Sequence, residues 1–183
     1  MQFKSTFMNL QSIEDMQEGI KEIGSRYNRI EKAEELVKEI EAEVNTAVTK
    51  AKEQKKDGEG PKVLILLGLP GSYLVSTENS YIADLVSLLG GTNAIIGQEG
   101  EYLSSNTEFL QQSNPDVILR LAHAMPGEVI EMFDEEFKTN DVWKHFNAVK
   151  NGEVYDLEEE LFGTTAALNV PEALNKLVDI FYK

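Results

Sequence analysis

The residue with the clearest chemical potential in this sequence is a histidine at the end of a predicted buried strand. His123 follows the apolar segment Val117–Leu121, within the stretch Arg120–Pro126 (RLAHAMP). Open α/β sheets bind ligands at the carboxyl ends of their strands, so an imidazole here would project into the natural cleft. Spacing alone leaves two interpretations open: a histidine that binds a ligand, or a loop histidine that is hydrogen-bonded to backbone.

Two further side chains are expected close to His123. Met125 lies two residues further along, and Tyr73 follows the other predicted central strand, Val63–Leu67. A thioether and a phenol ring both suit the wall of a largely apolar pocket. The second histidine, His145, stands among apolar residues at helical spacing, and we expect it to be structural.

The motifs of common enzyme classes are weak or missing in the sequence. Gly68-x-x-Gly71-Ser72 is too short for a phosphate-binding loop and has no lysine after its second glycine. Gly97-x-x-Gly100 lacks the strand and helix context of a dinucleotide fingerprint. The sequence has no Gly-x-Ser-x-Gly elbow, no cysteine and only two histidines, which excludes thiol chemistry and a histidine-rich metal site. We therefore expect a binding protein and not an enzyme.

Composition restricts the partners that the surface can bind. The 183 residues include 17 Lys+Arg and 32 Asp+Glu, a net charge of −15. Such an acidic chain is a poor partner for nucleic acid, because phosphate binding needs clustered lysines and arginines. Hydrophobic residues make up 42%, enough for a sizeable core. No apolar run approaches the roughly 18 residues of a membrane span, and the N-terminus lacks a basic-then-apolar signal pattern.

Two helices are predicted in the N-terminal part of the chain. Ser12–Asp15 (SIED) resembles a capping box, and apolar residues follow it at helical spacing. A break is expected at Gly24–Asn28, and a second helix over Arg29–Lys55 would be roughly 40 Å long. That length exceeds what a small α/β domain needs to cross its own sheet. The charged, glycine-rich segment Glu53–Pro61 then reads as a boundary.

From Lys62 onward, short apolar strands alternate with helices, and Gly68–Ser72 is expected to be a loop. The expected strands are Val63–Leu67, Ala94–Ile96, Val117–Leu121 and Glu153–Asp156. The expected helices are Tyr81–Leu89, Asn106–Gln112, Pro126–Phe137, Asp141–Phe146 and Val170–Phe181. This alternation predicts right-handed β-α-β units and a three-layer α/β fold with a mainly parallel sheet.

Three segments resemble the C-terminal lobe of class III substrate-binding proteins of ABC importers, the group that carries siderophores, cobalamin and haem. They are Ser80–Ala94 (SYIADLVSLLGGTNA), Thr107–Leu119 (TEFLQQSNPDVIL) and Trp143–Tyr155 (WKHFNAVKNGEVY). The long predicted helix matches the interlobe backbone helix of that family. The resemblance therefore implies connecting and interlobe helices over residues 1–58, a C-terminal α/β lobe over 59–183, and an N-terminal lobe that this chain lacks.

Two shorter segments are most similar to haem receptor lipoproteins of the iron-regulated surface determinant systems of Gram-positive bacteria. They are Leu69–Tyr81 (LPGSYLVSTENSY) and Leu121–Val129 (LAHAMPGEV). The resemblance implies a substrate-binding component of a haem importer, which carries haem b as its transported ligand. It further implies that His123 is an axial ligand of the haem iron. Met125, Tyr73 and Tyr81 are expected to line the pocket, while the methionine ligand of the family belongs to the missing lobe.

The same resemblance implies partners and a location. Glu108 matches a glutamate with which the wider group docks on basic residues of an ABC permease. Upstream surface haem-binding proteins would be further partners, and the full-length protein would be lipid-anchored at the extracellular face of the cell membrane. Whether the chain is an expressed fragment or a natural truncation stays open.

The sequence leaves two other functions open and predicts one assembly. The chain is otherwise a receptor for a ferric siderophore or cobalamin, with His123 only lining the cleft, or a stand-alone interaction domain that uses its acidic helix. The apolar stripe from Ile13 to Val48 is expected to be exposed, because its contacts with the missing lobe are lost. Such a stripe would pack against a second copy and give a homodimer.

Overall fold

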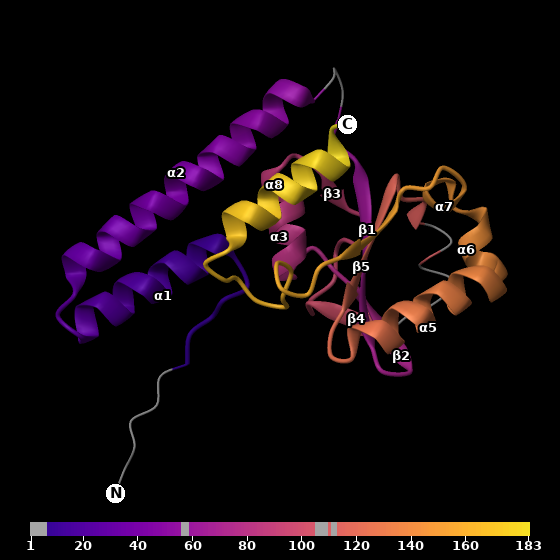
Figure 1. Cartoon of the computed structure of the whole chain (residues 1–183), viewed down its shortest axis with the longest axis horizontal. Coiled ribbons are helices and arrows are strands. Elements are labelled where there is room, and N and C mark those ends of the chain that lie inside the picture. Colours follow the sequence, from indigo (N-terminus) through magenta and orange to yellow (C-terminus); the bar gives the residue numbers. More distant parts are fainter. Residues whose placement is uncertain (1–6, 56–58, 105–109, 111–112) are drawn as a thin grey trace, which may run out of the picture.

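A helical hairpin lies beside a layered α/β lobe in the computed structural model, which describes residues 7–55, 59–104, 110 and 113–183 (Figure 1). Helices cover both faces of one mainly parallel sheet, which confirms the predicted fold class. The predicted helix over 106–112 falls almost entirely outside the described residues.

The hairpin consists of α1 (Ile13–Arg26) and α2 (Ile30–Gln54). Ser12 caps α1 as predicted, because its hydroxyl oxygen accepts the Asp15 N–H at 3.0 Å. With 25 residues, α2 is about 38 Å long. The two helices approach each other closely at Gly24. A Cβ at this position would lie 2.4 Å from the Cβ of Ala33, so only glycine permits the approach.

Most of the apolar stripe of this hairpin is buried or half-buried within the molecule, so the prediction that it is exposed is wrong. Ile13, Met16 and Ile40 are buried and belong to one core cluster with residues of α8 (Val170–Phe181). In Figure 1, α2 runs beside α8, and Lys50 Nζ of α2 lies 2.7 Å from Asp179 Oδ1 of α8. The large apolar side chains of α1 and α2 that stay exposed lie around the turn between them: Ile23, Tyr27 and Ile30.

In the described part of the chain, six strands form one sheet. At its centre β1 (Lys62–Leu69) pairs in parallel with β5 (Val117–Ala122), which pairs in parallel with β6 (Val154–Leu157). All three run in the same direction, so their carboxyl ends meet at one edge of the sheet.

The other side of β1 differs from the prediction. The segment expected as a loop at Gly68–Ser72 is instead a tight hairpin, in which Leu69 pairs with Ser72 and Gly71 has φ +78°. The chain returns as β2 (Ser72–Ser76), antiparallel to β1, and β2 pairs in turn with β4 (Tyr102–Ser104). The turn needs only two residues, Pro70 and Gly71, because positive φ at Gly71 lets the chain reverse its direction tightly.

The strand predicted at Ala94–Ile96 lies two residues earlier, as β3 (Thr92–Asn93). These two residues pair in parallel with the first two residues of β1. The Ala94 N–H still donates to the Val63 carbonyl of β1 at 2.8 Å, and beyond it the Ile95 N–H donates to Asn93 Oδ1 at 2.7 Å, a local bond in place of sheet pairing.

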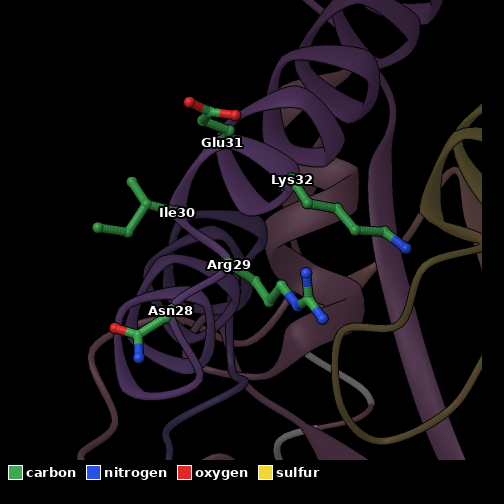
Figure 2. Close-up of a pocket in the computed structure, with 5 residues that line it drawn as sticks. All are labelled: Asn28, Arg29, Ile30, Glu31 and Lys32. Atoms are coloured by element: carbon green, nitrogen blue, oxygen red, sulfur yellow. The ribbon is translucent and has the colours of Figure 1, made fainter.

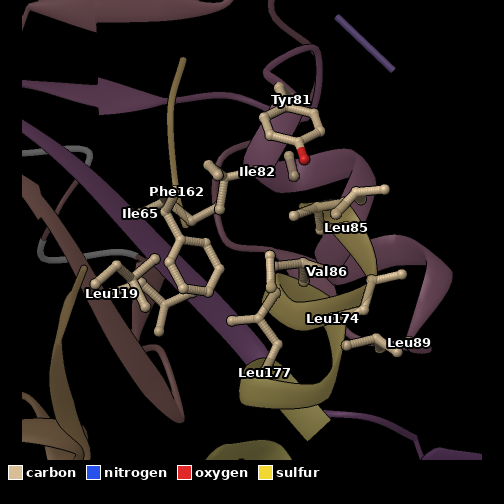
Figure 3. Packing of buried hydrophobic residues seen from close by; sticks show 14 of the residues in the cluster. Ile65, Tyr81, Ile82, Leu85, Val86, Leu89, Leu119, Phe162, Leu174 and Leu177 are labelled. Carbon is tan, nitrogen blue, oxygen red and sulfur yellow. The ribbon is translucent and has the colours of Figure 1, made fainter. Parts of the chain in front are cut away.

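Helices form the two outer layers. On one face lie α3 (Tyr81–Leu88) and α8, which pack on Ile65 and Leu119 from the sheet (Figure 3). On the other face, next to Leu64 and Ile118, lie α5 (Pro126–Thr139), α6 (Asp141–His145) and α7 (Asn147–Lys150). Strand residues therefore alternate between two separate cores, as expected for a sheet covered on both faces.

Candidate functional site

His123 lies at the carboxyl edge of the sheet, where the sequence predicts it. It follows β5 directly, and its backbone N–H donates to the Gly68 carbonyl of β1 at 2.9 Å. Its side chain is exposed, so the imidazole is available to a ligand that approaches this edge. His145 is also exposed, but it is the last residue of α6 and does not follow a strand of the sheet.

A strained turn presents this histidine. Ala124 has φ +59° and Met125 has φ +48°, although neither is glycine. Left-handed backbone costs such residues on the order of 1–2 kcal/mol each, and strain of this kind concentrates at functional sites. Pro126 then begins α5, so the chain reverses direction within three residues. Met125 is 51% exposed as a result and lies beside His123 on the open edge.

Tyr73 contributes to the same edge in a different way. It pairs with Gly68 across β1 and β2, but its half-buried ring packs against Phe133 and Trp143, with centroids 5.8 and 6.0 Å away. Its hydroxyl donates to Glu136 Oε1 at 3.4 Å. Tyr73 therefore supports α5 beneath the His123 turn, and only part of its ring is left for a pocket wall.

Tyr81 does not fit the expected role as a pocket residue. Its side chain is 1% exposed and belongs to the core cluster between α3 and α8, with Ile82 and Leu85 beside it (Figure 3). Burial, together with the nearby Asp84 charge, raises the pKa of the Tyr81 hydroxyl. A ligand at the surface of the described lobe cannot reach this ring, because Tyr81 begins the helix on the core side.

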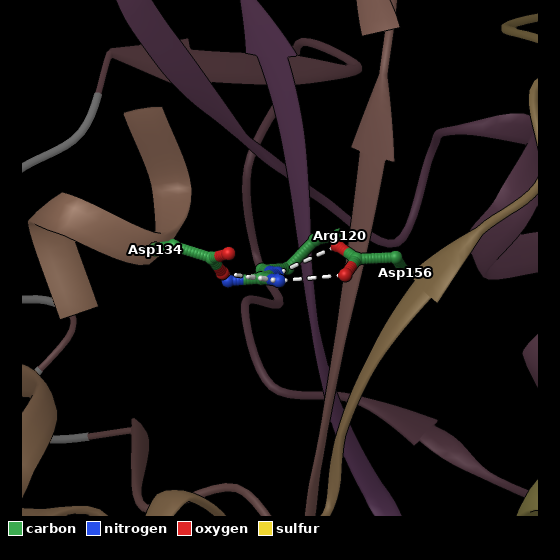
Figure 4. A network of polar contacts seen from close by, with 3 residues as sticks. All are labelled: Arg120, Asp134 and Asp156. Atoms are coloured by element: carbon green, nitrogen blue, oxygen red, sulfur yellow. Dashed lines mark hydrogen bonds and ion pairs between the residues drawn. The ribbon is translucent and has the colours of Figure 1, made fainter. Parts of the chain in front are cut away.

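The structure adds one residue that the sequence analysis missed. Arg120 of β5 is 7% exposed, and Figure 4 shows its guanidinium between Asp134 of α5 and Asp156 of β6. It donates from Nε and Nη2 to the two Asp156 oxygens at 2.8 and 2.6 Å, and Nη2 lies 2.9 Å from Asp134 Oδ1. Three elements around the His123 turn are thereby joined through one side chain.

Two aromatic rings complete the environment of this arginine. Its guanidinium carbon lies 5.4 Å from the centroid of Phe133 and 5.2 Å from that of Phe137. Burial disfavours the Arg120 charge, but the hydrogen bonds and charges of Asp156 and Asp134 outweigh it and raise the pKa of Arg120. The signal in the sequence was an arginine inside an otherwise apolar strand, because a buried charge requires a partner of opposite charge.

The turn of the helical hairpin, which lies away from the sheet (Figure 1), carries a hollow of about 420 Å³ that is lined by residues 28–32. Figure 2 shows Ile30 extending to the side opposite Arg29 and Lys32. This hollow holds no histidine and has no strand ends beside it, so it does not contribute to the His123 site.

Glu108 lies outside the described residues. Across the described ranges, no three His, Cys, Asp or Glu side chains gather to hold a metal ion, and no helix is long and apolar enough to cross a membrane. A single imidazole can bind a metal that arrives within a larger ligand, because such a ligand supplies the remaining donors itself.

The described fold is a sheet covered by helices on both faces, with the exposed His123 at its carboxyl edge. The chain belongs to the periplasmic binding protein family, which matches residues 1–161.

Individual relatives agree with this assignment. The chain is 50% identical over all 183 residues to the high-affinity heme uptake system protein IsdE of Staphylococcus aureus strain Newman, and it spans 62% of that protein's length. It is also similar to the crystal structure of S. aureus IsdE complexed with heme, at 50% identity and TM-score 0.92, covering 99% of this chain and 69% of that one. An ABC transporter substrate-binding protein from Listeria monocytogenes EGD-e is 54% identical, with TM-score 0.88, covering 98% and 68%.

Proposed function

We propose that this chain is the connecting helices and C-terminal lobe of a haem receptor of an ABC importer. The similarity to a heme uptake protein over the whole chain, at 50% identity, carries this proposal. The geometry agrees with it, since an exposed imidazole stands at the sheet edge where such folds bind ligands.

In this proposal His123 supplies one axial bond to the iron of haem b, which is the transported ligand. Porphyrin nitrogens fill the four in-plane positions of the iron, so one imidazole from this lobe is enough to anchor it. The half-exposed Met125 offers a soft, apolar contact to the face or edge of the porphyrin. Gly68 fixes the turn, because its carbonyl accepts the backbone N–H of His123.

Replacing the proposed ligand tests this function directly. We expect His123→Ala to lower haem affinity at least about tenfold and to shift the Soret band, because one iron bond is lost. His145→Ala is the matched control, since it removes an imidazole that is also exposed, from α6. A titration followed by absorbance separates the cases. Equal spectra and affinities for wild type and His123→Ala would refute the assignment, and binding of ferric siderophore without a Soret band would favour the alternative receptor.

The division of the chain and its cellular partners follow from the same proposal. Residues 1–58 would be connecting and interlobe helices, and 59–183 the C-terminal lobe. The receptor would act at the extracellular face of the membrane as a lipid-anchored protein, and would receive haem from upstream surface proteins. Glu108 would dock on a basic residue of the permease, so Glu108→Ala should leave haem affinity unchanged and lower haem uptake by cells.

A homodimer of this chain would involve only the turn of the helical hairpin. Ile23, Tyr27 and Ile30 are exposed there, whereas the other apolar side chains of the stripe are buried or half-buried. Such a small apolar surface supports weak pairing only. We expect sedimentation to show concentration-dependent self-association that Tyr27→Ser/Ile30→Ser abolishes. A chain that stays monomeric at high concentration would exclude the dimer.

A further inference from the structure

A groove with apolar walls lies between α5 and β6, at the same edge of the sheet as His123. Its volume is about 370 Å³. Ala122 of β5 forms its inner end, Pro126 and Ile130 of α5 form one wall, and Leu157 of β6 forms the other. Because Ala122 and Pro126 flank the His123 turn, any protein that approaches the ligand site also meets this groove.

Carboxylates line the remaining side of the groove. Asp156, Glu158, Glu159 and Glu160 contribute four negative charges. Two of these charges already have a partner, because Arg120 pairs with Asp156 at 2.6 Å and Lys176 Nζ lies 2.9 Å from Glu158. Among the ion pairs of the described residues, none involves Glu159 or Glu160, and both side chains are exposed. The groove therefore carries an uncompensated negative potential over apolar walls.

The acidic side of the groove is held in place before any partner arrives. Both Asp156 oxygens accept hydrogen bonds from the buried Arg120, which fixes the orientation of that carboxylate (Figure 4). The turn that carries Glu159 and Glu160 is closed by backbone bonds, since Leu161 N–H and Phe162 N–H donate to the Glu158 carbonyl at 3.0 and 2.9 Å. The backbone that carries Glu159 and Glu160 is therefore ordered before binding, which lowers the conformational cost of binding.

From this arrangement we propose that the groove between α5 and β6 binds an arginine side chain that a protein partner presents. The alkyl stem and the weakly hydrated guanidinium plane suit the walls formed by Ala122, Pro126, Ile130 and Leu157. The guanidinium donors reach the carboxylates, to which they can bond in pairs. An anionic group is repelled here, and an uncharged apolar group would desolvate the carboxylates without compensation. This site does not depend on haem binding.

A peptide titration tests the site in the chain as it exists. The probe is acetyl-Gly-Arg-Gly-amide, added to ¹⁵N-labelled protein at low ionic strength and followed by amide chemical shifts. We expect fast-exchange shifts centred on Ala122, Ile130, Leu157 and Glu160, with a Kd on the order of millimolar, and a loss of the shifts at high salt. The same peptide with citrulline in place of arginine keeps the shape without the charge and should not bind.

Two variants with the same change of charge complete the experiment. Glu159→Gln/Glu160→Gln should weaken binding of the arginine peptide about three- to tenfold, because two rim charges are lost. Glu34→Gln/Glu35→Gln removes two carboxylates from the exposed face of α2 and should leave the affinity unchanged. The proposal is wrong if the shifts spread equally over α2, if the citrulline peptide binds equally well, or if both double variants behave alike. Amide spectra of each variant verify folding, so a negative result does not reflect unfolding.

Discussion

The two faces of the sheet are built differently. The face under α3 and α8 is a continuous apolar core that also takes in the buried residues of α1 and α2. The face under α5 combines an aromatic cluster with a buried arginine and a shared carboxylate acceptor. Both faces are closely packed, but among the described residues the second holds the buried arginine and a carboxylate oxygen that three side chains share.

Those contacts are concentrated around α5. One oxygen of Glu136 accepts from the side chains of Tyr73, Asn140 and Trp143, at 3.4, 2.7 and 3.3 Å. Arg120 adds the ion pairs to Asp134 and Asp156 on either side. Apolar packing tolerates small shifts of a helix, whereas hydrogen bonds fix its orientation and position. The face that must hold the His123 turn is thus the one with the stricter geometry.

The largest expected effect tests the apolar face. Leu174 of α8 is fully buried, and Leu174→Ala should lower the free energy of unfolding by about 2–5 kcal/mol, since it leaves a cavity. Leu168→Ala makes the same chemical change at a side chain that is 60% exposed, and should cost little. Urea denaturation measures both. If the comparison holds, the haem affinity of folded Leu174→Ala stays at the wild-type value.

The sequence predicts the apolar face well because its signals are local. The helix over Val170–Phe181 has the predicted bounds, and α3 ends next to Gly90, which has the expected positive φ of +81°. Strong periodicity and a glycine stop are properties of a few neighbouring residues. β2 was missed for the opposite reason: the five residues Ser72–Ser76 become a strand only through their pairing with β1 and β4.

The site was predictable in position but not in detail. A buried strand that ends in histidine predicts where His123 lies, as found. The left-handed Ala124 and Met125 carry no signal, because neither residue type favours positive φ. Tyr81 was wrongly expected in the pocket, because the direction of a side chain on α3 depends on how that helix packs on α8.

A smaller effect is expected where α5 approaches the sheet most closely. A Cβ on Gly68 would lie 2.3 Å from Val129 Cγ1 and 2.5 Å from Phe133 Cε2. Gly68→Ala should therefore push α5 outward, cost about 1–3 kcal/mol of stability, and weaken haem binding because Gly68 also anchors the His123 turn.

Gly127→Ala is the control for that substitution. It lies in the first turn of the same helix, and a Cβ there meets no atom within 4 Å. Alanine is a better helix former than glycine, so this variant should be as stable as wild type or slightly more stable. Thermal unfolding and a haem titration of both variants decide the point. Gly68→Ala with unchanged haem affinity would contradict the link between α5 and the site.

The smallest expected effect concerns a carboxylate on the edge of the otherwise apolar face. Asp84 of α3 accepts the Ile13 N–H at the start of α1 at 3.1 Å. Burial raises its pKa, the bond from Ile13 partly offsets this, and the charges of Asp15 and Glu14 raise it further. Since the folded pKa exceeds the unfolded value, the ionised carboxylate reduces stability at neutral pH. That loss is recovered as the pH falls through the raised pKa.

Asp84→Asn keeps an oxygen for the Ile13 N–H and carries no charge, so it should be slightly more stable than wild type at pH 7, with a difference that shrinks in acid. Asp179→Asn, at an exposed carboxylate of α8, should show no such gain. Urea unfolding between pH 4 and 8 measures the free energy of unfolding of each protein. If the value for Asp84→Asn minus that for wild type instead rises as the pH falls, Asp84 stabilises this face through its charge.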